Sequence, residues 1–416
     1  MKIAIIGAGI SGLTASRVLS KKHSVTLYEK NDYLGGHANT FEITEKDKIL
    51  PVDTGFIVFN HLNYPNLSKL FSDINVEIED SDMSFSVHNE KTDLEYNGSS
   101  LSKIFSQKKN ILNIKFLLML HDIIRFNKNS PRILNSPYSD KITVKDFIET
   151  NNYKNYFLEN YLIPLGSSLW SCPKEKFMSF PILFVIEFLH NHCMLQINKR
   201  PVWKTVKGGS KEYVKKLLFG LKNLVIVKQP VWKVVRNARD VSIYTDNGKK
   251  EDFDEVVLAC HSDQALNLVE NLDSKEKEIL KPFKYEKNMT TLHTDTSVLP
   301  NNKDIWASWN YRIPINNKTK VTVTYNMNKL QNIDSDSTYC VSLNLDSKID
   351  KEKIIKEFEY EHPIFFPGII EYQAQHKSLI RNNKLSFCGA YWGYGFHEDG
   401  VNSAIRVCES YDLGLV

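Results

Sequence analysis

The spacing of apolar residues predicts a β-α-β unit at the start of the chain. Residues 2–6 form a continuous apolar run, residues 10–19 have helical spacing, and residues 24–29 form a second apolar run. A buried strand, a helix and another strand in this order are typical of a doubly wound parallel sheet. The predicted fold class is therefore α/β.

The later pattern predicts a mixture of helices and strands. Short alternating runs between residues 48 and 98 indicate small strands, whereas residues 101–170 have mostly helical spacing. Strand-like runs then return, and a last helix is expected from about Asp399. These later strands are predicted at 224–235, 241–244, 255–259, 289–293, 321–325, 340–345 and 385–388.

A glycine-rich turn joins the first predicted strand to the first helix. Gly7, Gly9 and Gly12 match the spacing GxGxxG, with Ile10 and Ser11 inside the motif. The first glycine makes a tight turn, the second lets the backbone approach a pyrophosphate, and the third lets the helix pack on the strand. The motif and its position predict a dinucleotide-binding site.

Composition and charge argue against a nucleic-acid partner, a metal site and a disulfide framework. The net charge of +4 on 416 residues is too small to indicate nucleic-acid binding. The six cysteines have no CxxC spacing, so neither a metal site nor a disulfide framework is indicated, and free thiols suit a reducing compartment. The N-terminus enters a strand directly after Lys2 without the features of a secretory signal. We therefore expect a cytoplasmic protein.

Two stretches of the chain, 111–126 and 180–195, are rich in large apolar residues. Both are short and carry charged residues or histidine, so neither predicts a transmembrane span. The first is flanked by lysines, which is compatible with a helix lying on the inner, anionic surface of a membrane. The alternative is a core helix with one solvated face, which is the commoner arrangement.

The residues after the second strand identify the dinucleotide. Glu29 ends that strand, followed by Lys30, at the spacing of the carboxylate that binds ribose hydroxyls. A second glycine turn follows, with Gly35, Gly36 and His37. It resembles the turn of the flavin-containing amine oxidase and phytoene desaturase superfamily that approaches the FAD pyrophosphate. The resemblance implies FAD, and no cysteine is placed for a covalent attachment. Relatives usually carry arginine at the histidine position, so the charge there is expected to depend on pH.

Later motifs extend the resemblance over nearly the whole chain. Residues 207–210 and 254–260 are similar to the central glycine pair and a later strand of the superfamily, and residues 387–400 to its C-terminal flavin motif. In that motif a helix N-terminus faces the flavin ring and stabilises negative charge there. Relatives often have an acidic residue in place of Ala390. The resemblance implies these further cofactor residues: Asp53, Thr54, Gly55, Val231, Gly389, Ala390, Phe396, His397, Glu398, Asp399 and Gly400.

The superfamily pattern also implies the domain division. We predict a Rossmann-like FAD-binding domain of the amine oxidase type, formed by residues 1–60, 200–275 and 383–416. An interleaved α+β substrate domain would comprise residues 61–199 and 276–382. The chain has no internal repeat and no low-complexity linker, which favours domains built from discontinuous segments.

The C-terminal motif is similar to one bacterial branch of the superfamily, which is associated with cyclopropane-fatty-acid-synthase-like methyltransferases. This implies a desaturase of a methylated fatty acyl chain, still linked to phospholipid, with a methyltransferase as partner. One alternative is an amine oxidase acting on a small amine or polyamine, in which aromatic residues would surround the flavin. Another is a redox-silent protein, stabilised by FAD, that hands lipid to the methyltransferase. The oxidant of the flavin would be oxygen, a quinone or a protein, because no second nucleotide motif follows Gly12.

Desaturation needs a hydride acceptor and a group that takes a proton. His61, His293 and His397 are candidate bases, and His293 is the predicted catalytic residue because its strand corresponds to the one passing the flavin. The aromatic stripe of residues 177–189 has helical spacing that would suit a tunnel, but such stripes more often form core.

Overall fold

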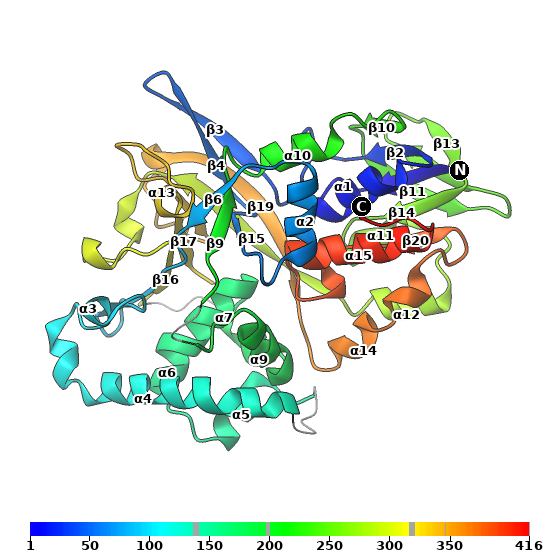
Figure 1. The fold of residues 1–416 in the computed structure, drawn as a ribbon. Helices are drawn as coiled ribbons and strands as arrows, with labels where there is room; N and C mark the ends of the chain where they lie inside the picture. The colour runs from blue at the N-terminus through cyan, green and yellow to red at the C-terminus, as the bar shows by residue number, and fades with distance from the viewer. Residues whose placement is uncertain (136–140, 197–199, 316–320, 346, 416) are drawn as a thin grey trace.

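The computed structural model describes residues 1–135, 141–196, 200–315, 321–345 and 347–415. Five parallel strands form the sheet that contains the N-terminus (Figure 1). Their order is β10 (Leu224–Val227), β2 (Ser24–Tyr28), β1 (Lys2–Ile6), β14 (Glu255–Leu258) and β20 (Leu385–Phe387). The predicted α/β class is confirmed.

Alternate residues of the central strands enter two different cores. Ile3 and Ile5 of β1 pack with four helices on one face, whereas Ala4 and Ile6 belong to the core on the other face. This is the two-residue period of a strand buried on both sides. The four helices are α1 (Ile10–Leu19), α2 (Pro65–Asp73), α10 (Lys211–Leu218) and α15 (His397–Glu409). On the opposite face lie α11 (Ser262–Leu268), α12 (Ser274–Leu280) and the ribbon of β11 (Val231–Arg236), β12 (Val241–Thr245) and β13 (Lys250–Phe253).

A second, seven-stranded sheet lies beside the first. Its longest strands, β19 (Ile354–Ile364) and β15 (Lys284–His293), pair antiparallel along most of their length. The other strands, in order, are β18 (Cys340–Leu343), β17 (Val323–Asn326), β16 (Trp309–Ile313), β7 (Phe85–Asn89) and β8 (Leu94–Asn97). Sheet pairing therefore brings together segments that are more than two hundred residues apart in sequence.

Two small sheets connect these parts. One pairs β3 (Thr40–Glu45) with β4 (Lys48–Asp53), and the other has the order β5 (Val58–Phe59), β9 (Trp203–Val206), β6 (Ile78–Ser81). The short helices α13 (Met327–Leu330) and α14 (Ile369–Gln373) lie in later connections.

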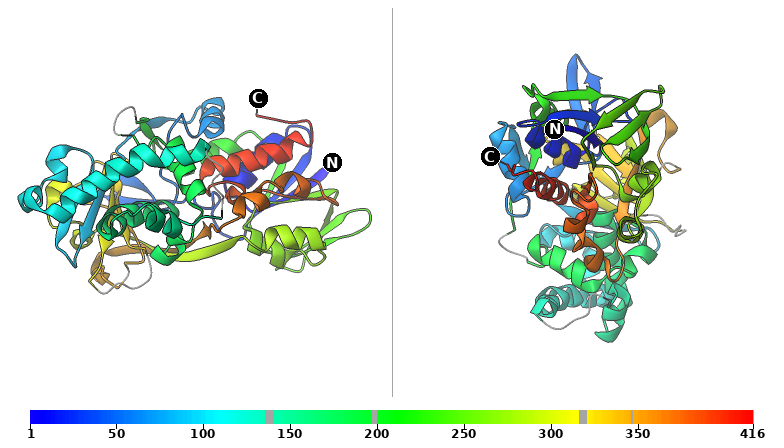
Figure 2. Two further views of the ribbon diagram at one scale, coloured as in Figure 1. Left: turned by 90° about the horizontal axis from the view of Figure 1, so that it is seen from below. Right: turned by 90° about the vertical axis from the view of Figure 1, so that its right-hand side faces the viewer.

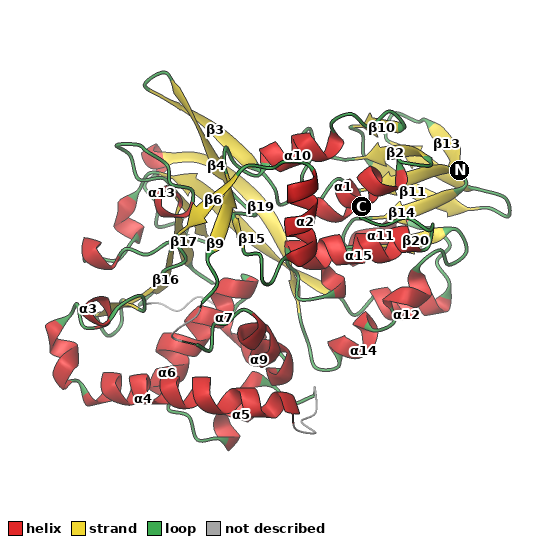
Figure 3. Cartoon of the chain, viewed as in Figure 1, coloured by secondary structure: helices red, strands yellow, loops and turns green. Residues whose placement is uncertain are grey.

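Helices gather beneath the second sheet in the view of Figure 3. They are α3 (Leu101–Ile104), α4 (Ile114–Asn129), α5 (Val144–Thr150), α6 (Asn155–Phe157), α7 (Ile163–Trp170), α8 (Lys174–Met178) and α9 (Ile182–Asn191). A π-helical turn, Leu158–Leu162, joins α6 to α7. Within the described part of the chain, no helix is long and apolar enough to cross a membrane.

Two expectations about elements are corrected. The strand predicted at residues 224–235 is two strands, because the chain leaves the parallel sheet near Pro230, which has no N–H for a ladder. Strand β19 was not predicted from the sequence. The aromatic stripe is mainly core, as expected: Phe177, Phe180, Phe184, Phe188 and Leu189 are all buried.

Candidate functional site

A cavity of about 690 Å³ opens at the carboxyl ends of β1, β2 and β14. Ligands of open α/β sheets bind at this edge, and the volume is in the usual range for a ligand pocket. One part is lined by the glycine-rich turns. The other, here called the aromatic part, is lined by Met83, Leu169, Trp170, Phe188, His192, Met194, Trp203, Trp309 and Tyr325.

The first glycine turn presents backbone to the cavity. Gly7 has φ +103°, a conformation that favours glycine, and α1 begins at Ile10 without a side-chain cap. A Cβ added to Gly9 would meet no atom within 4 Å, whereas one added to Gly12 would stand 1.9 Å from the Gly7 carbonyl oxygen. Gly7, Gly9, Ile10 and Ser11 line the cavity, and Gly12 instead supports the turn.

The Glu29 carboxylate lies at the cavity edge, where β2 ends. It accepts hydrogen bonds from the backbone N–H of Ala8 at 2.8 Å and of Asn31 at 3.0 Å. These two bonds hold a buried carboxylate beside the first turn, which is the arrangement that a ribose-binding group needs. Lys30 also lines the cavity.

The second glycine turn packs directly on the first. The Gly35 N–H donates to the Ala8 carbonyl at 2.9 Å, and a Cβ on Gly36 would stand 3.1 Å from the Gly9 Cα. His37 follows, and its buried Nε2 has no hydrogen-bond partner among the described residues. Burial lowers the pKa of His37 to about 4, so this imidazole is neutral at neutral pH in the flavin-free protein.

Asp53 and Thr54, predicted as cofactor residues, do not line the cavity. Asp53 accepts hydrogen bonds from Thr40, from the backbone and hydroxyl of Ser210, and from Gln331, so it joins β4 to the start of α10. Burial raises its pKa to about 6. The Thr54 hydroxyl binds the Asn39 carbonyl at 3.0 Å. Gly55 of this motif does line the cavity.

Some residues of the C-terminal motif line the cavity, and others do not. Gly389, Ala390, Phe396 and His397 line the cavity, with the His397 ring stacked on Phe56 at 3.7 Å between centroids. Val231, predicted near the adenine, also lines it.

Three predicted residues of the C-terminal motif are placed elsewhere. Glu398 accepts from the backbone N–H groups of Asn66 and Leu67 at the start of α2. Asp399 accepts from the Phe396 N–H at 2.9 Å, and Gly400 lets α15 pack closely on α1. In the structure, Glu398, Asp399 and Gly400 therefore support the packing of α15 and do not line the cavity.

His293, the predicted catalytic residue, does not line the cavity. Its Nε2 faces the Ser342 hydroxyl at 2.8 Å, and its Nδ1 accepts from the Asp295 N–H at 3.0 Å. Strand β15 does reach the cavity, but toward its other end, through Lys287 and Tyr285. Tyr285 is eight residues from His293 along the strand, or about 26 Å. The candidate base His61 is also outside the cavity lining.

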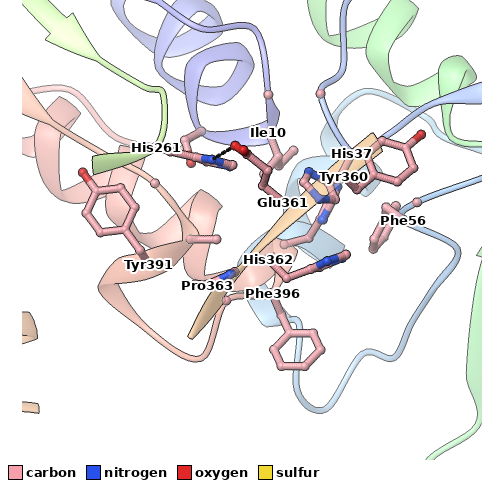
Figure 4. Close-up of a pocket in the computed structure, with 18 of the residues that line it drawn as sticks. Ile10, His37, Phe56, His261, Tyr360, Glu361, His362, Pro363, Tyr391 and Phe396 are labelled. Atoms are coloured by element: carbon pink, nitrogen blue, oxygen red, sulfur yellow. Dashed lines mark ion pairs between the residues drawn. The ribbon is translucent and has the colours of Figure 1, made fainter. Parts of the chain in front are cut away.

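Strand β19 supplies residues that sequence reasoning missed. Tyr360 and His362 lie toward His37 in Figure 4, with ring centroids 5.0 and 5.3 Å from that imidazole. Glu361 points toward His261, and the two form an ion pair at 3.4 Å. Burial lowers the pKa of His362 to about 3. No local motif marks these residues, because they meet the glycine turns only through pairing of distant strands.

The donors and spaces of the first part fit the adenosine diphosphate portion of FAD. Open space stands over Gly9, a carboxylate is held at Glu29, and the unpaired Nε2 of His37 faces the second turn. Of the six cysteines, all in the described chain, Cys260 alone lines the cavity, beside Gly7. Burial raises its pKa to about 12, so the thiol is protonated and a poor nucleophile.

Comparisons with known proteins agree with this geometry. The family model "Flavin containing amine oxidoreductase" matches residues 10–291. A 15-cis-phytoene desaturase of Synechococcus elongatus is 35% identical over 78 residues, which are 18% of this chain and 16% of that protein. The match thus spans less than a fifth of this curated relative.

Solved structures share the fold over the full length. A putrescine oxidase variant superposes with a TM-score of 0.69 at 15% identity, covering 99% of this chain and 98% of that one. A fatty acid isomerase from P. acnes that produces CLA superposes with a TM-score of 0.68 at 15% identity, covering 97% and 96%. At these identities the likeness establishes the fold.

Proposed function

Because the chain belongs to the flavin-containing amine oxidoreductase family, we propose that it is an FAD-dependent oxidoreductase that desaturates a fatty acyl chain. When bound, FAD accepts a hydride equivalent from the substrate at its ring. The glycine turns and Glu29 would hold the cofactor non-covalently, and the protonated Cys260 thiol supports this mode.

The observation that carries the acyl substrate is the composition of the aromatic part. None of its nine residues, all in the described chain, is acidic. The acidic residues that line the cavity are Glu29 after β2, Asp263 in α11, and Glu359 and Glu361 on β19. On β19, Glu359 pairs with Lys287 and Glu361 with His261. A charged amine would find no carboxylate to pair with in the aromatic part, whereas an alkyl chain could pack against its aromatic and apolar side chains.

Removal of two hydrogens from adjacent carbons leaves a carbon–carbon double bond, one hydride equivalent in the cofactor and one proton to be accepted. Neutral imidazoles are available for that proton without His293. Both His192 and His397 line the cavity, and burial lowers the pKa of His192 to about 4 and that of His397 to about 3, so each is a neutral but weak base at neutral pH.

We further propose that the acyl chain is methylated and phospholipid-linked, and that a methyltransferase supplies it. The similarity of the C-terminal motif to the branch associated with such methyltransferases supports this. The fatty acid isomerase of the same fold supports an acyl substrate in a site of this architecture.

Amine oxidation is the second candidate, because four of the aromatic residues that could surround an amine line the cavity: Trp170, Trp309, Tyr391 and Tyr394. The nearby Trp392 does not line the cavity. A putrescine oxidase also shares the fold.

Anaerobic reduction of the bound flavin tests the proposal. Phospholipids with methylated monounsaturated chains should bleach the flavin absorbance, and putrescine should not. A Leu169→Trp variant, which fills part of the aromatic part, should bleach at least about ten-fold more slowly while keeping its flavin spectrum. Bleaching by amines alone would establish the second candidate, and bleaching by neither would favour a redox-silent lipid-handling protein.

A further inference from the structure

We propose that residues 101–128 form a docking face for an anionic membrane surface. This segment comprises α3, the turn Lys108–Leu112 and α4, and we call its exposed side the basic apolar face. Helix α4 lies at the lower edge of the molecule in Figure 1 and crosses the front in the view from below in Figure 2.

The face is unusually apolar for an exposed surface. Seven of the sixteen exposed large apolar residues of the described chain lie in these few turns: Leu101, Ile111, Leu112, Ile114, Leu117, Leu118 and Ile124. Leu112 is 88% exposed and Ile114 72%. Contiguous exposed apolar side chains of this kind mark interaction sites.

Helix α4 is apolar on two sides, and one side packs against the protein. Phe116, Met119 and Phe126 are buried in the core, whereas Ile114, Leu118 and Ile124 face away from it. An ordinary surface helix would carry polar residues at the outer positions. The outer side chains therefore need another apolar environment.

Charge identifies that environment. Residues 101–128 contain six lysines and arginines and one acid, Asp122, so their net charge is +5 in a chain whose total is +4. Asp122 is buried against Arg125. Lys103, Lys108, Lys115 and Lys128 have no ion pair with the residues that the structure describes. Lysines flanking exposed aliphatic side chains fit a bilayer, where the ammonium groups meet lipid phosphates and the aliphatic groups enter the interface.

A second copy of the chain is a poorer occupant of the basic apolar face. Two such faces would each bring a net charge of +5 to the interface, where repulsion between like charges is costly. The segment would lie on the membrane and not cross it, in keeping with the short helices here.

Vesicle binding of the flavin-loaded full chain tests this proposal, and it requires no turnover, so it is independent of the proposed reaction. The protein should sediment with vesicles of phosphatidylcholine and phosphatidylglycerol, and not with phosphatidylcholine alone. Raising the salt concentration should weaken binding.

Paired variants separate the two contributions. Leu112→Asp with Ile114→Asp, and separately Lys108→Gln with Lys115→Gln, should each weaken binding about ten-fold or more. All four side chains are exposed, so flavin content should be unchanged. Phe219→Asp, an exposed site outside the basic apolar face, is the control and should bind normally.

Three results would overturn the proposal. The protein could fail to bind anionic vesicles, or both double variants could retain vesicle binding. The double variants could also change their oligomeric state without any change in vesicle binding. The last would assign the face to contact between copies.

Discussion

Gly9 and Gly12 stand three residues apart in one turn, and the structure gives them different reasons to be glycine. Space is open around a Cβ on Gly9, while a Cβ on Gly12 would overlap the Gly7 carbonyl. Gly9 therefore leaves room for a ligand, and Gly12 leaves room for the packing of the turn.

Alanine variants separate these two roles. Gly9→Ala should fold with nearly unchanged stability, because its backbone is extended, but should bind FAD at least about ten-fold more weakly. Gly12→Ala should lose stability or fail to fold. Thermal unfolding of the flavin-free proteins and FAD titration measure the two effects. Equal loss of stability in both variants, or unchanged FAD affinity in Gly9→Ala, would contradict the assignment.

For single residues, the sequence predicted the two glycine turns, but it did not show which residues of each motif line the cavity and which support the fold. Glu29 and Gly35 could be placed because their partners are close in sequence. Asp53 and Glu398 lie in equally recognisable motifs, yet they bind Ser210 and the start of α2, which are distant in sequence. A motif indicates that a residue type is needed at a position, but only the packing shows whether that residue contacts a ligand or holds the fold together.

Among the elements, the β-α-β unit could be predicted because its two strands are mostly apolar and four of the five residues in each are buried. Strand β19 could not, since it carries Lys356, Glu357, Glu359 and Glu361 and has no apolar run. It forms by pairing with β15, and that pairing brings Tyr360 and the other missed residues to the cavity. The position of His293 has the same origin: the predicted strand, residues 289–293, is one half of β15, and which end of β15 meets the cavity depends on the sheet.

For the whole molecule, buried histidines predict how stability depends on pH. Six of the twelve histidines have a pKa lowered by burial to about 3 or 4: His37, His192, His293, His362, His376 and His397. In the unfolded chain these groups take up protons below about pH 6.5, whereas the folded protein does not. Their contribution is complete above that pH and is lost as the pH falls toward 4.

Three buried acids act in the opposite direction. Burial raises the pKa of Asp53 to about 6 and that of Asp399 to about 7, and it also raises the pKa of Glu398, so each favours the folded state as the pH falls toward 4. Because six histidines oppose three acids, the midpoint of urea unfolding of the flavin-free protein should fall steadily between pH 6.5 and 5. A constant or rising midpoint over this range would contradict the account.

The most direct test of the central claim is the visible spectrum of the purified protein, followed by acid precipitation and identification of the released flavin. The account predicts a flavin spectrum, with intact FAD left in the supernatant after precipitation. A colourless protein that cannot take up FAD would contradict the assignment of the cavity, and a flavin that stays with the precipitate would contradict non-covalent binding.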